Sequence, residues 1–269
     1  MANVKANGIR IHYERTGGGK PPLVLCHGIT DTGGCWPRVA AALKKDYDLI
    51  MLDARGHGLS EAPKSGYSLD VMADDVAGVI TALGLQRPGI IGHSMGAMTA
   101  AVTAAHYPNL VRCLVLEDPP WTYPPQSAAA WATQLDHIRA DALIRKDMTT
   151  DEMVEYSVCI NPGISRWDKS EFDPWSEAKR LVSEQVMEGL RSDLPQWQDT
   201  VRRIACPTLL ITADPAKGGA VTPGAVQRIS ALNPKMRVVN IAEAGHNVRR
   251  EAFEKYMEAV TTFLTSVAK

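Results

Sequence analysis

The chain has 269 residues, of which 45% are hydrophobic and 22% are charged, so it can bury a sizeable core without help from metals or disulfides. Lysine and arginine number 29 against 30 aspartates and glutamates, and this balance argues against nucleic acid as the main partner. No apolar run approaches the roughly 18 residues needed to cross a bilayer, so we expect no membrane-spanning segment.

Short apolar runs at intervals along the chain predict the strands of a sheet. The first two are predicted as a hairpin, with strands at 4–7 and 9–14 and a turn near Asn7-Gly8. The later runs are continuously apolar, which is typical of strands buried on both faces of a parallel sheet. They lie at 23–26, 49–52, 89–91, 113–116, 208–212 and 238–241.

Helical patterns alternate with these runs. The segment 95–106 is almost entirely small and apolar, so we expect a helix that is buried all round. Thr222 followed by Pro223 predicts the start of another helix. The helical patterns lie at 69–83, 95–106, 223–232 and 252–267. This alternation predicts an α/β fold with a mostly parallel sheet and helices on both faces.

The stretch 119–203 interrupts the alternation, because it contains no convincing strand. Helices are predicted there at 127–146, 150–158 and 174–190, the last one starting after Asp173. Five of the six tryptophans fall in this stretch: Trp121, Trp131, Trp167, Trp175 and Trp197. We expect a helical lid packed over the C-terminal edge of the sheet.

The five cysteines include no C-x-x-C pair, and three of them lie in or beside apolar runs. We expect reduced, mostly buried thiols and neither a zinc finger nor an iron–sulfur site. The first fifteen residues lack an apolar region of the kind found in secretory signals. Together these observations favour a cytoplasmic protein with no metal site.

The segment Gly92-His93-Ser94-Met95-Gly96 fits the pattern G-x-S-x-G between a predicted strand and a predicted helix. That context turns a weak pattern into a strong one, because it is the structural condition for a nucleophile turn. The turn presents Ser94 in a strained conformation, and side chains at Gly92 or Gly96 would collide where strand and helix pass. The N–H of Met95, at the start of the helix, can stabilise an oxyanion.

At this point the sequence resembles the α/β-hydrolase superfamily over nearly the whole chain. The resemblance rests on four motifs: His27-Gly28, Asp53-Ala-Arg55-Gly56-His57-Gly58-Leu-Ser60, the serine turn itself, and Ala244-Gly245-His246. It implies an eight-stranded sheet whose second strand is antiparallel. It also implies a core formed by residues 1–118 and 204–269, with the lid at 119–203.

Ser94 needs an adjacent base, because a serine hydroxyl at its ordinary pKa is a poor nucleophile. His246 is the candidate among seven histidines, since it follows the last predicted strand and completes the chain order Ser, acid, His. Four other histidines lie in an early strand, in helices or in the serine motif, and His27 and His57 are expected to shape the neighbouring loops.

The acid that would orient His246 has more than one candidate. Family members usually carry it just after the seventh strand, where Asp214 is the only acid in a turn lengthened by Gly218-Gly219. A minority carries it after the sixth strand, where this chain has Glu117 and Asp118. We take Asp214 as the first choice and Asp118 or Glu117 as alternatives, any of which would stabilise the charged imidazole.

By family position, the N–H of Ile29 is the second oxyanion donor. Asp53 and Arg55 are expected to brace their own loop.

Trp121 is the candidate pocket residue, because it lies just past the sixth strand. No lysine or arginine stands beside the catalytic motifs, and Arg249 and Arg250 are expected to face water. These features favour a neutral, moderately apolar acyl substrate.

The leading hypothesis is therefore a cofactor-free serine hydrolase of a small carboxylic ester or lactone that acts through an acyl-enzyme on Ser94. Amide hydrolysis, perhydrolysis by cofactor-free haloperoxidases and C–C bond hydrolysis would use the same residues. A non-catalytic receptor of small molecules on the same fold is the alternative outside enzyme chemistry. The sequence gives no indication of oligomeric state.

Overall fold

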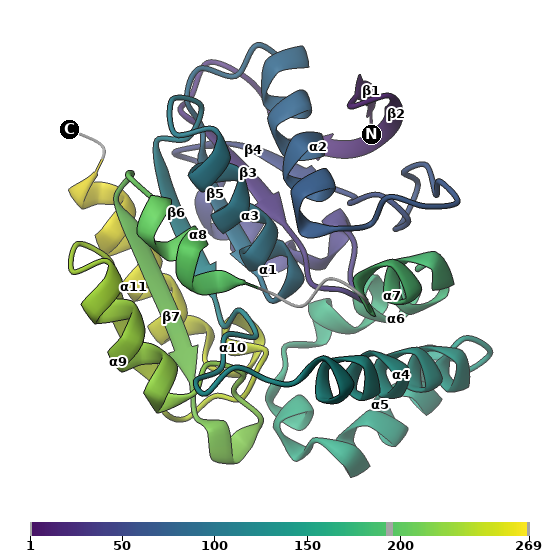
Figure 1. Ribbon diagram of the computed structural model, residues 1–269. Helices are drawn as coiled ribbons and strands as arrows, with labels where there is room; N and C mark the ends of the chain where they lie inside the picture. The colour runs from purple at the N-terminus through teal and green to yellow at the C-terminus, as the bar shows by residue number, and fades with distance from the viewer. Residues whose placement is uncertain (1, 192–195, 268–269) are drawn as a thin grey trace.

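The computed structural model describes residues 2–191 and 196–267. Residues 1, 192–195 and 268–269, which fall within the predicted core and lid, lie outside the described residues. The described chain forms one eight-stranded sheet in the order β1-β2-β4-β3-β5-β6-β7-β8 (Figure 1). The strands are β1 (Ala2–Ala6), β2 (Ile9–Arg15), β3 (Pro22–Cys26), β4 (Asp48–Leu52), β5 (Gly89–His93), β6 (Cys113–Glu117), β7 (Thr208–Ala213) and β8 (Arg237–Ile241).

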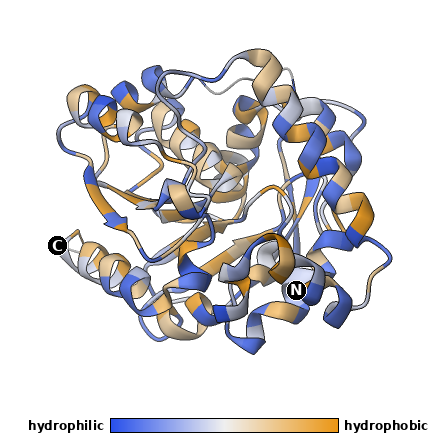
Figure 2. Ribbon diagram, turned by 90° about the horizontal axis from the view of Figure 1, so that it is seen from below, coloured by the Kyte–Doolittle hydropathy of each residue, from blue (hydrophilic) through white to orange (hydrophobic). Residues whose placement is uncertain are grey.

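The predicted fold is confirmed, including the antiparallel second strand. β2 pairs antiparallel with both β1 and β4, and every other pairing in the sheet is parallel. The central strands are buried along nearly their whole length, as their continuously apolar sequences predict. The edge strand β8 is only partly buried. Figure 2 shows the apolar strands inside the molecule and polar residues mainly on the outer helices.

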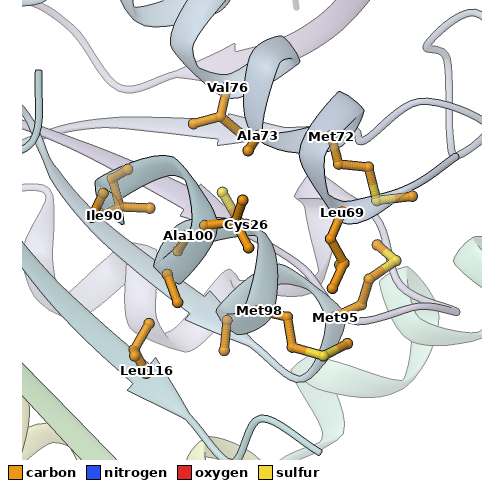
Figure 3. Packing of buried hydrophobic residues seen from close by; sticks show 14 of the residues in the cluster. Cys26, Leu69, Met72, Ala73, Val76, Ile90, Met95, Met98, Ala100 and Leu116 are labelled. Carbon is orange, nitrogen blue, oxygen red and sulfur yellow. The ribbon is translucent and has the colours of Figure 1, made fainter. Parts of the chain in front are cut away.

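Helices cover both faces of the sheet. One face carries α2 (Leu69–Ala82), α3 (Met95–His106), α8 (Trp197–Arg203) and α9 (Pro223–Leu232). The other face carries α1 (Pro37–Leu43) and α11 (Phe253–Ser266). Every residue of α3 except its last, His106, is buried, as its small apolar sequence predicts. Figure 3 shows Met95, Met98 and Ala100 of this helix packed among Cys26, Leu69 and Leu116.

The segment between β6 and β7 is helical. It contains α4 (Ala128–Arg145), α5 (Thr150–Ile160), α6 (Phe172–Arg180) and α7 (Glu184–Arg191), with short 3-10 turns at Pro162–Arg166 and Lys169–Glu171. These elements lie together beside the sheet, at its C-terminal edge (Figure 1). We call them the lid. Its own small core is formed by Met153, Ile164, Trp167 and Trp175.

Two details of this segment differ from the sequence prediction. The single helix expected at 174–190 is two helices, because the backbone between them pairs with the loop at 56–58 instead of continuing the helix. Leu181 O accepts from Gly58 N, and Ser183 N donates to Gly56 O. In addition, α8 falls inside the expected lid but packs against α3 and α9, so the structure places it with the core.

In the part of the chain that the structure describes, no helix is both long and apolar enough to cross a membrane.

Candidate active site

Ser94 occupies the turn between β5 and α3. Its backbone has φ +53° and ψ −116°, a conformation that costs a non-glycine residue free energy and persists only where the surroundings enforce it. A side chain at Gly92 would collide with the backbone of Gly96, and one at Gly96 would collide with the carbonyl of Cys26. The expectation that the two glycines let strand and helix pass closely therefore agrees with the structure.

The imidazole of His246 lies beside this serine. Its Nε2 is 2.9 Å from Ser94 Oγ. His246 stands on the loop between β8 and α10 (Val248–Glu251), and Gly245 before it packs so closely on the carbonyl of Lys217 that a side chain would not fit. The structure thus brings together the predicted nucleophile and base, which lie 152 positions apart in the sequence.

Asp118, not Asp214, holds the other side of the imidazole. Asp118 Oδ2 lies 2.7 Å from His246 Nδ1, and the side chain of Asp118 is fully buried. In the sheet register His93 pairs with Glu117, so Ser94 and Asp118 follow neighbouring strands at the same level. Both residues have positive φ, and Asp is one of the few residue types that tolerates this conformation.

The first choice for the acid, Asp214, is corrected by these contacts. Its carboxylate accepts from the N–H of Ala216 at 2.9 Å and caps the 3-10 turn Pro215–Lys217. The lengthened loop that follows serves Asp118 instead, because the N–H groups of Ala220 and Val221 donate to its two carboxylate oxygens at 2.7 and 3.3 Å. The loop after β7 therefore supplies hydrogen-bond donors where an acid was expected.

Glu117, the other alternative, points away from His246. Strand side chains alternate between faces, and Glu117 meets Arg249, whose backbone N–H and guanidinium contact its carboxylate at 2.9 and 3.3 Å. Burial raises the pKa of Glu117 above its usual value, against the opposing charge of Arg249.

The contacts of His246 indicate which of its ring nitrogens carries the hydrogen. An ionised Asp118 only accepts, so Nδ1 carries the hydrogen and the Nε2 lone pair faces the Ser94 hydroxyl. Burial alone would lower the pKa of His246, but the hydrogen bond and charge of Asp118, with the charge of Glu117, raise it above its ordinary value. His93 adds a third restraint, because its Nε2 lies 3.0 Å from the backbone carbonyl of His246.

The expected oxyanion donors are the backbone N–H groups of Ile29 and Met95. Ile29 and Met95 both line the cavity that contains Ser94 and His246. Gly28 packs directly against Ser94, where any larger residue would collide with His93. Among the described residues neither Ile29 N nor Met95 N has a hydrogen-bond partner, so both donors are free for a ligand.

The loop after β4 acts as a brace, as expected. Asp53 accepts from the N–H groups of Gly33 and Leu59, both at 2.8 Å, and Arg55 forms an ion pair with Asp75 at 2.5 Å. His57 Nε2 lies 2.8 Å from the carbonyl oxygen of Ile29. His27 contacts the carbonyl of Gly28 and accepts from Ala54 N.

The cavity above Ser94 has a volume of about 660 Å³ and lies between the sheet edge and the lid. Trp121, the predicted pocket residue, does not line it. Trp121 is 1% exposed and stacks on Trp197 of α8, so it belongs to the core. The tryptophans that line the cavity are Trp131, Trp167 and Trp175 of the lid.

The cavity is also charged, although no lysine or arginine was expected beside the catalytic motifs and a neutral substrate was favoured. Arg145, Lys179 and Arg250 line it together with Asp31 and Asp141. Arg250 was expected to face water but is 2% exposed. The only sequence signal for Lys179 is its position four residues after Trp175, which places both on one face of α6.

Asp31 connects three of the buried cations. Its carboxylate lies 3.0 Å from Lys179 Nζ, 3.0 Å from Arg249 Nη2 and 3.2 Å from Arg250 Nη1. Burial would raise the pKa of Asp31, but these three positive charges hold it well below its usual value. Arg249, like Arg250, was expected to face water and is 1% exposed.

No group of three or more His, Cys, Asp or Glu side chains within residues 2–191 and 196–267 is arranged to hold a metal ion.

Residues 21–249 match the family model described as the alpha/beta hydrolase fold. The chain belongs to the α/β-hydrolase fold family. Among curated relatives, N-formylmaleamate deformylase of Pseudomonas putida is 32% identical, and the alignment covers 97% of this chain and 95% of the relative. The 2-(acetamidomethylene)succinate hydrolase of Mesorhizobium japonicum is 30% identical over 93% and 90% of the two chains.

A solved structure agrees with this assignment. The crystal structure of E-2-(acetamidomethylene)succinate hydrolase superimposes with a TM-score of 0.82 at 27% identity, and the match covers 98% of each chain. These similar proteins are hydrolases, and this chain shares their fold over nearly its whole length.

Proposed function

We propose that this α/β hydrolase is a serine hydrolase that cleaves an acyl bond, with Ser94 as nucleophile, His246 as base and Asp118 as the acid that orients the base. The observation that carries the proposal is the unbroken hydrogen-bond path from Asp118 through His246 to Ser94, with distances of 2.7 and 2.9 Å. This is the geometry in which a base within hydrogen-bond reach activates a serine.

The proposed reaction has two halves. Ser94 Oγ attacks the acyl carbon while His246 Nε2 takes the hydroxyl proton, and the N–H groups of Ile29 and Met95 stabilise the oxyanion that forms. The bond to the leaving group then breaks, and His246 gives its proton to that group. Water attacks the acyl-enzyme with His246 again as base. The bond to Ser94 Oγ then breaks, His246 returns the proton to this oxygen, and the carboxylic acid product leaves.

The charge of the cavity supports a substrate that carries a carboxylate, in place of the neutral substrate favoured by the sequence. Three cationic and two anionic side chains line the cavity. Arg145 is paired only with Asp141, at 3.0 Å, and its buried Nε has no hydrogen-bond partner in the described structure. An arginine with unused donors is suited to a carboxylate.

The bond that is cleaved is proposed to be an amide, one of the alternatives that the sequence left open beside an ester or lactone. The support comes from the two curated relatives, since one is named as a deformylase of N-formylmaleamate and the other as a hydrolase of 2-(acetamidomethylene)succinate. Both names describe N-acyl compounds with a carboxylate. The same three residues hydrolyse esters by the same steps, so ester turnover is expected as a secondary activity.

A matched substrate panel tests this proposal. It pairs small N-acyl amides and nitrophenyl esters with and without a carboxylate, assayed with the wild type and with Ser94→Ala. We expect turnover of the carboxylate-bearing amides to exceed that of the neutral ones, and Ser94→Ala to lose all of it at an unchanged melting temperature. Equal turnover by Ser94→Ala would refute the proposal, and ligand binding without turnover would favour the receptor alternative.

A further inference from the structure

Side-chain nitrogens contact three consecutive carbonyl groups of the loop that carries Ile29. His27 Nδ1 lies 2.8 Å from Gly28 O, and His57 Nε2 lies 2.8 Å from Ile29 O. The next carbonyl, Thr30 O, accepts from Lys179 Nζ at 2.8 Å. His27 Nδ1 and Lys179 Nζ donate to their carbonyls, because His27 Nε2 accepts from Ala54 N and an ammonium group only donates. His57 has a carbonyl at each ring nitrogen, since its Nδ1 also lies 2.9 Å from Arg55 O.

Because a peptide group is planar, the carbonyl of Gly28 sets the direction of the Ile29 N–H. The carbonyl of Thr30 sets in the same way the direction of the Asp31 N–H, which donates to Gly28 O at 3.0 Å and so connects Lys179 to the Ile29 donor.

Lys179 differs from the other two side chains in its origin. His27 and His57 belong to the core, whereas Lys179 belongs to α6 of the lid. Its ammonium group also contacts Asp31 Oδ1 at 3.0 Å. Lys179 therefore contacts both of the residues that follow Ile29: the carbonyl of Thr30 and the carboxylate of Asp31. Lys179 is 4% exposed, and its Nζ lies 5.1 Å from the centre of the Trp175 ring.

We propose that Lys179 is a positioning residue through which the lid holds the oxyanion loop in its catalytic conformation. The oxyanion hole is then complete only while α6 lies over Thr30 and Asp31, which links the position of the lid to the chemistry at Ser94. This inference rests on the proposed function, in which Ile29 supplies an oxyanion donor.

The core holds Asp31 independently of the lid, which makes the proposal testable without unfolding the protein. Arg249 and Arg250 still pair with Asp31 when Lys179 is removed, and Arg249 is itself anchored to Glu117 by its backbone N–H. No buried carboxylate is left unpaired in Lys179→Met. Only Thr30 O loses its donor, so the expected change is local to the loop.

A rival role for Lys179 is binding the carboxylate of the substrate, since it also lines the cavity. The two roles predict different results with substrates that differ in charge. A positioning residue affects every acyl substrate, because each one forms an oxyanion. A carboxylate-binding residue affects only the charged substrate, and the effect appears mainly in KM.

The experiment compares Lys179→Met, Lys179→Arg and the wild type on 4-nitrophenyl acetate and on mono-4-nitrophenyl succinate. The control is Arg139→Met, which removes an exposed lid cation paired with Glu184 on α7. We expect Lys179→Met to lower kcat on both esters by a similar factor of about 10 to 100, as misplacement of a catalytic group by about 1 Å does. KM should stay within about threefold on both esters, and Lys179→Arg should recover part of the rate.

Two further readouts follow the loop itself. The affinity for a boronic acid that forms a tetrahedral adduct on Ser94 should fall by the same factor as kcat, because the adduct also needs the oxyanion donors. Hydrogen exchange of a peptide spanning residues 27–32 should be faster in Lys179→Met and unchanged in Arg139→Met.

The outcomes separate the two proposals. Loss confined to the succinate ester, or unchanged rates together with unchanged hydrogen exchange, would overturn the role of Lys179. A wild type that neither turns over any ester nor forms the boronate adduct would instead overturn the proposed function, and the positioning role would fall with it. Faster exchange in that case would show only a structural contact between lid and loop.

Discussion

The edge of the sheet and the lid contribute to the cavity in different ways. At the sheet edge, backbone contacts fix the reacting groups: Ser94 N donates to Glu117 O at 2.9 Å, and Asp118 N donates to Ile211 O at 2.9 Å. In the lid, side chains such as those of Arg145 and Lys179 line the cavity and are held there by ion pairs and by contacts with aromatic rings. We therefore propose that the sheet edge carries out the chemistry, while the lid selects the substrate and positions the oxyanion loop.

The sharpest test at the sheet edge compares the two candidate acids. We expect Asp118→Asn to lower kcat/KM by about 10³- to 10⁴-fold, because the amide cannot stabilise the charged imidazole or enforce its tautomer. The matched control Asp214→Asn should change the rate by less than about threefold. The measurement is kcat/KM with one ester for both variants, and a larger loss in Asp214→Asn would reverse the assignment of the acid.

The pH dependence of the rate tests the contact between Asp118 and His246 through the pKa of the base. Catalysis needs neutral His246, so kcat/KM should fall about tenfold per pH unit below the pKa of this residue. Asp118 and Glu117 raise that pKa against burial and the charge of Arg249, so the acid limb should have its midpoint above 6.5. The midpoint should move to lower pH in Asp118→Asn. A wild-type midpoint below 6.5 would contradict the electrostatic account of the site.

At the lid, Arg145→Met tests whether side chains there determine the substrate. We expect KM for a carboxylate-bearing amide to rise about tenfold or more, because a hydrogen bond to a charged group contributes about 1.5–3 kcal/mol. The rate with a neutral nitrophenyl ester should stay unchanged, since that ester lacks the carboxylate. Equal losses on both substrates would mean that Arg145 supports the fold of the lid and does not bind the substrate.

The smallest effect is expected at Trp121, which lies at the border of the two regions. Trp121→Phe should leave KM within about twofold, because this ring stacks on Trp197 in the core and does not line the cavity. It should lower the melting temperature by a few degrees, as loss of buried aromatic contacts does. A substantial rise in KM with an unchanged melting temperature would indicate that Trp121 contacts the substrate after all.

The sequence predicted the sheet edge better than the lid for a physical reason. Ser94 and His246 lie in short motifs in which glycines allow close backbone contacts, and such local requirements leave a readable pattern. The apolar runs and helical patterns predicted a mostly parallel α/β sheet in the same way, whereas the eight strands and the antiparallel second strand were expected from the family resemblance. Asp118 was named only as an alternative, because choosing between two acids depends on which loop folds back toward His246.

The lid side chains could not be placed in this way. Whether Lys179, Arg249 and Arg250 are buried depends on Asp31, which lies far from all three in the sequence. A charged residue in a helical pattern is usually exposed, so only tertiary contacts distinguish these three from surface cations. Trp121 failed as a pocket residue for the same reason, since its partner Trp197 lies 76 positions later.

The central claim is that the hydroxyl of Ser94 is activated by His246 held in place by Asp118. The most direct measurement is the rate at which a fluorophosphonate modifies the protein, followed by intact mass and peptide mapping. We predict one adduct, on Ser94, which is absent in Ser94→Ala, forms much more slowly in Asp118→Asn and is unaffected in Asp214→Asn. Modification elsewhere, or equal rates in Asp118→Asn and the wild type, would contradict the account.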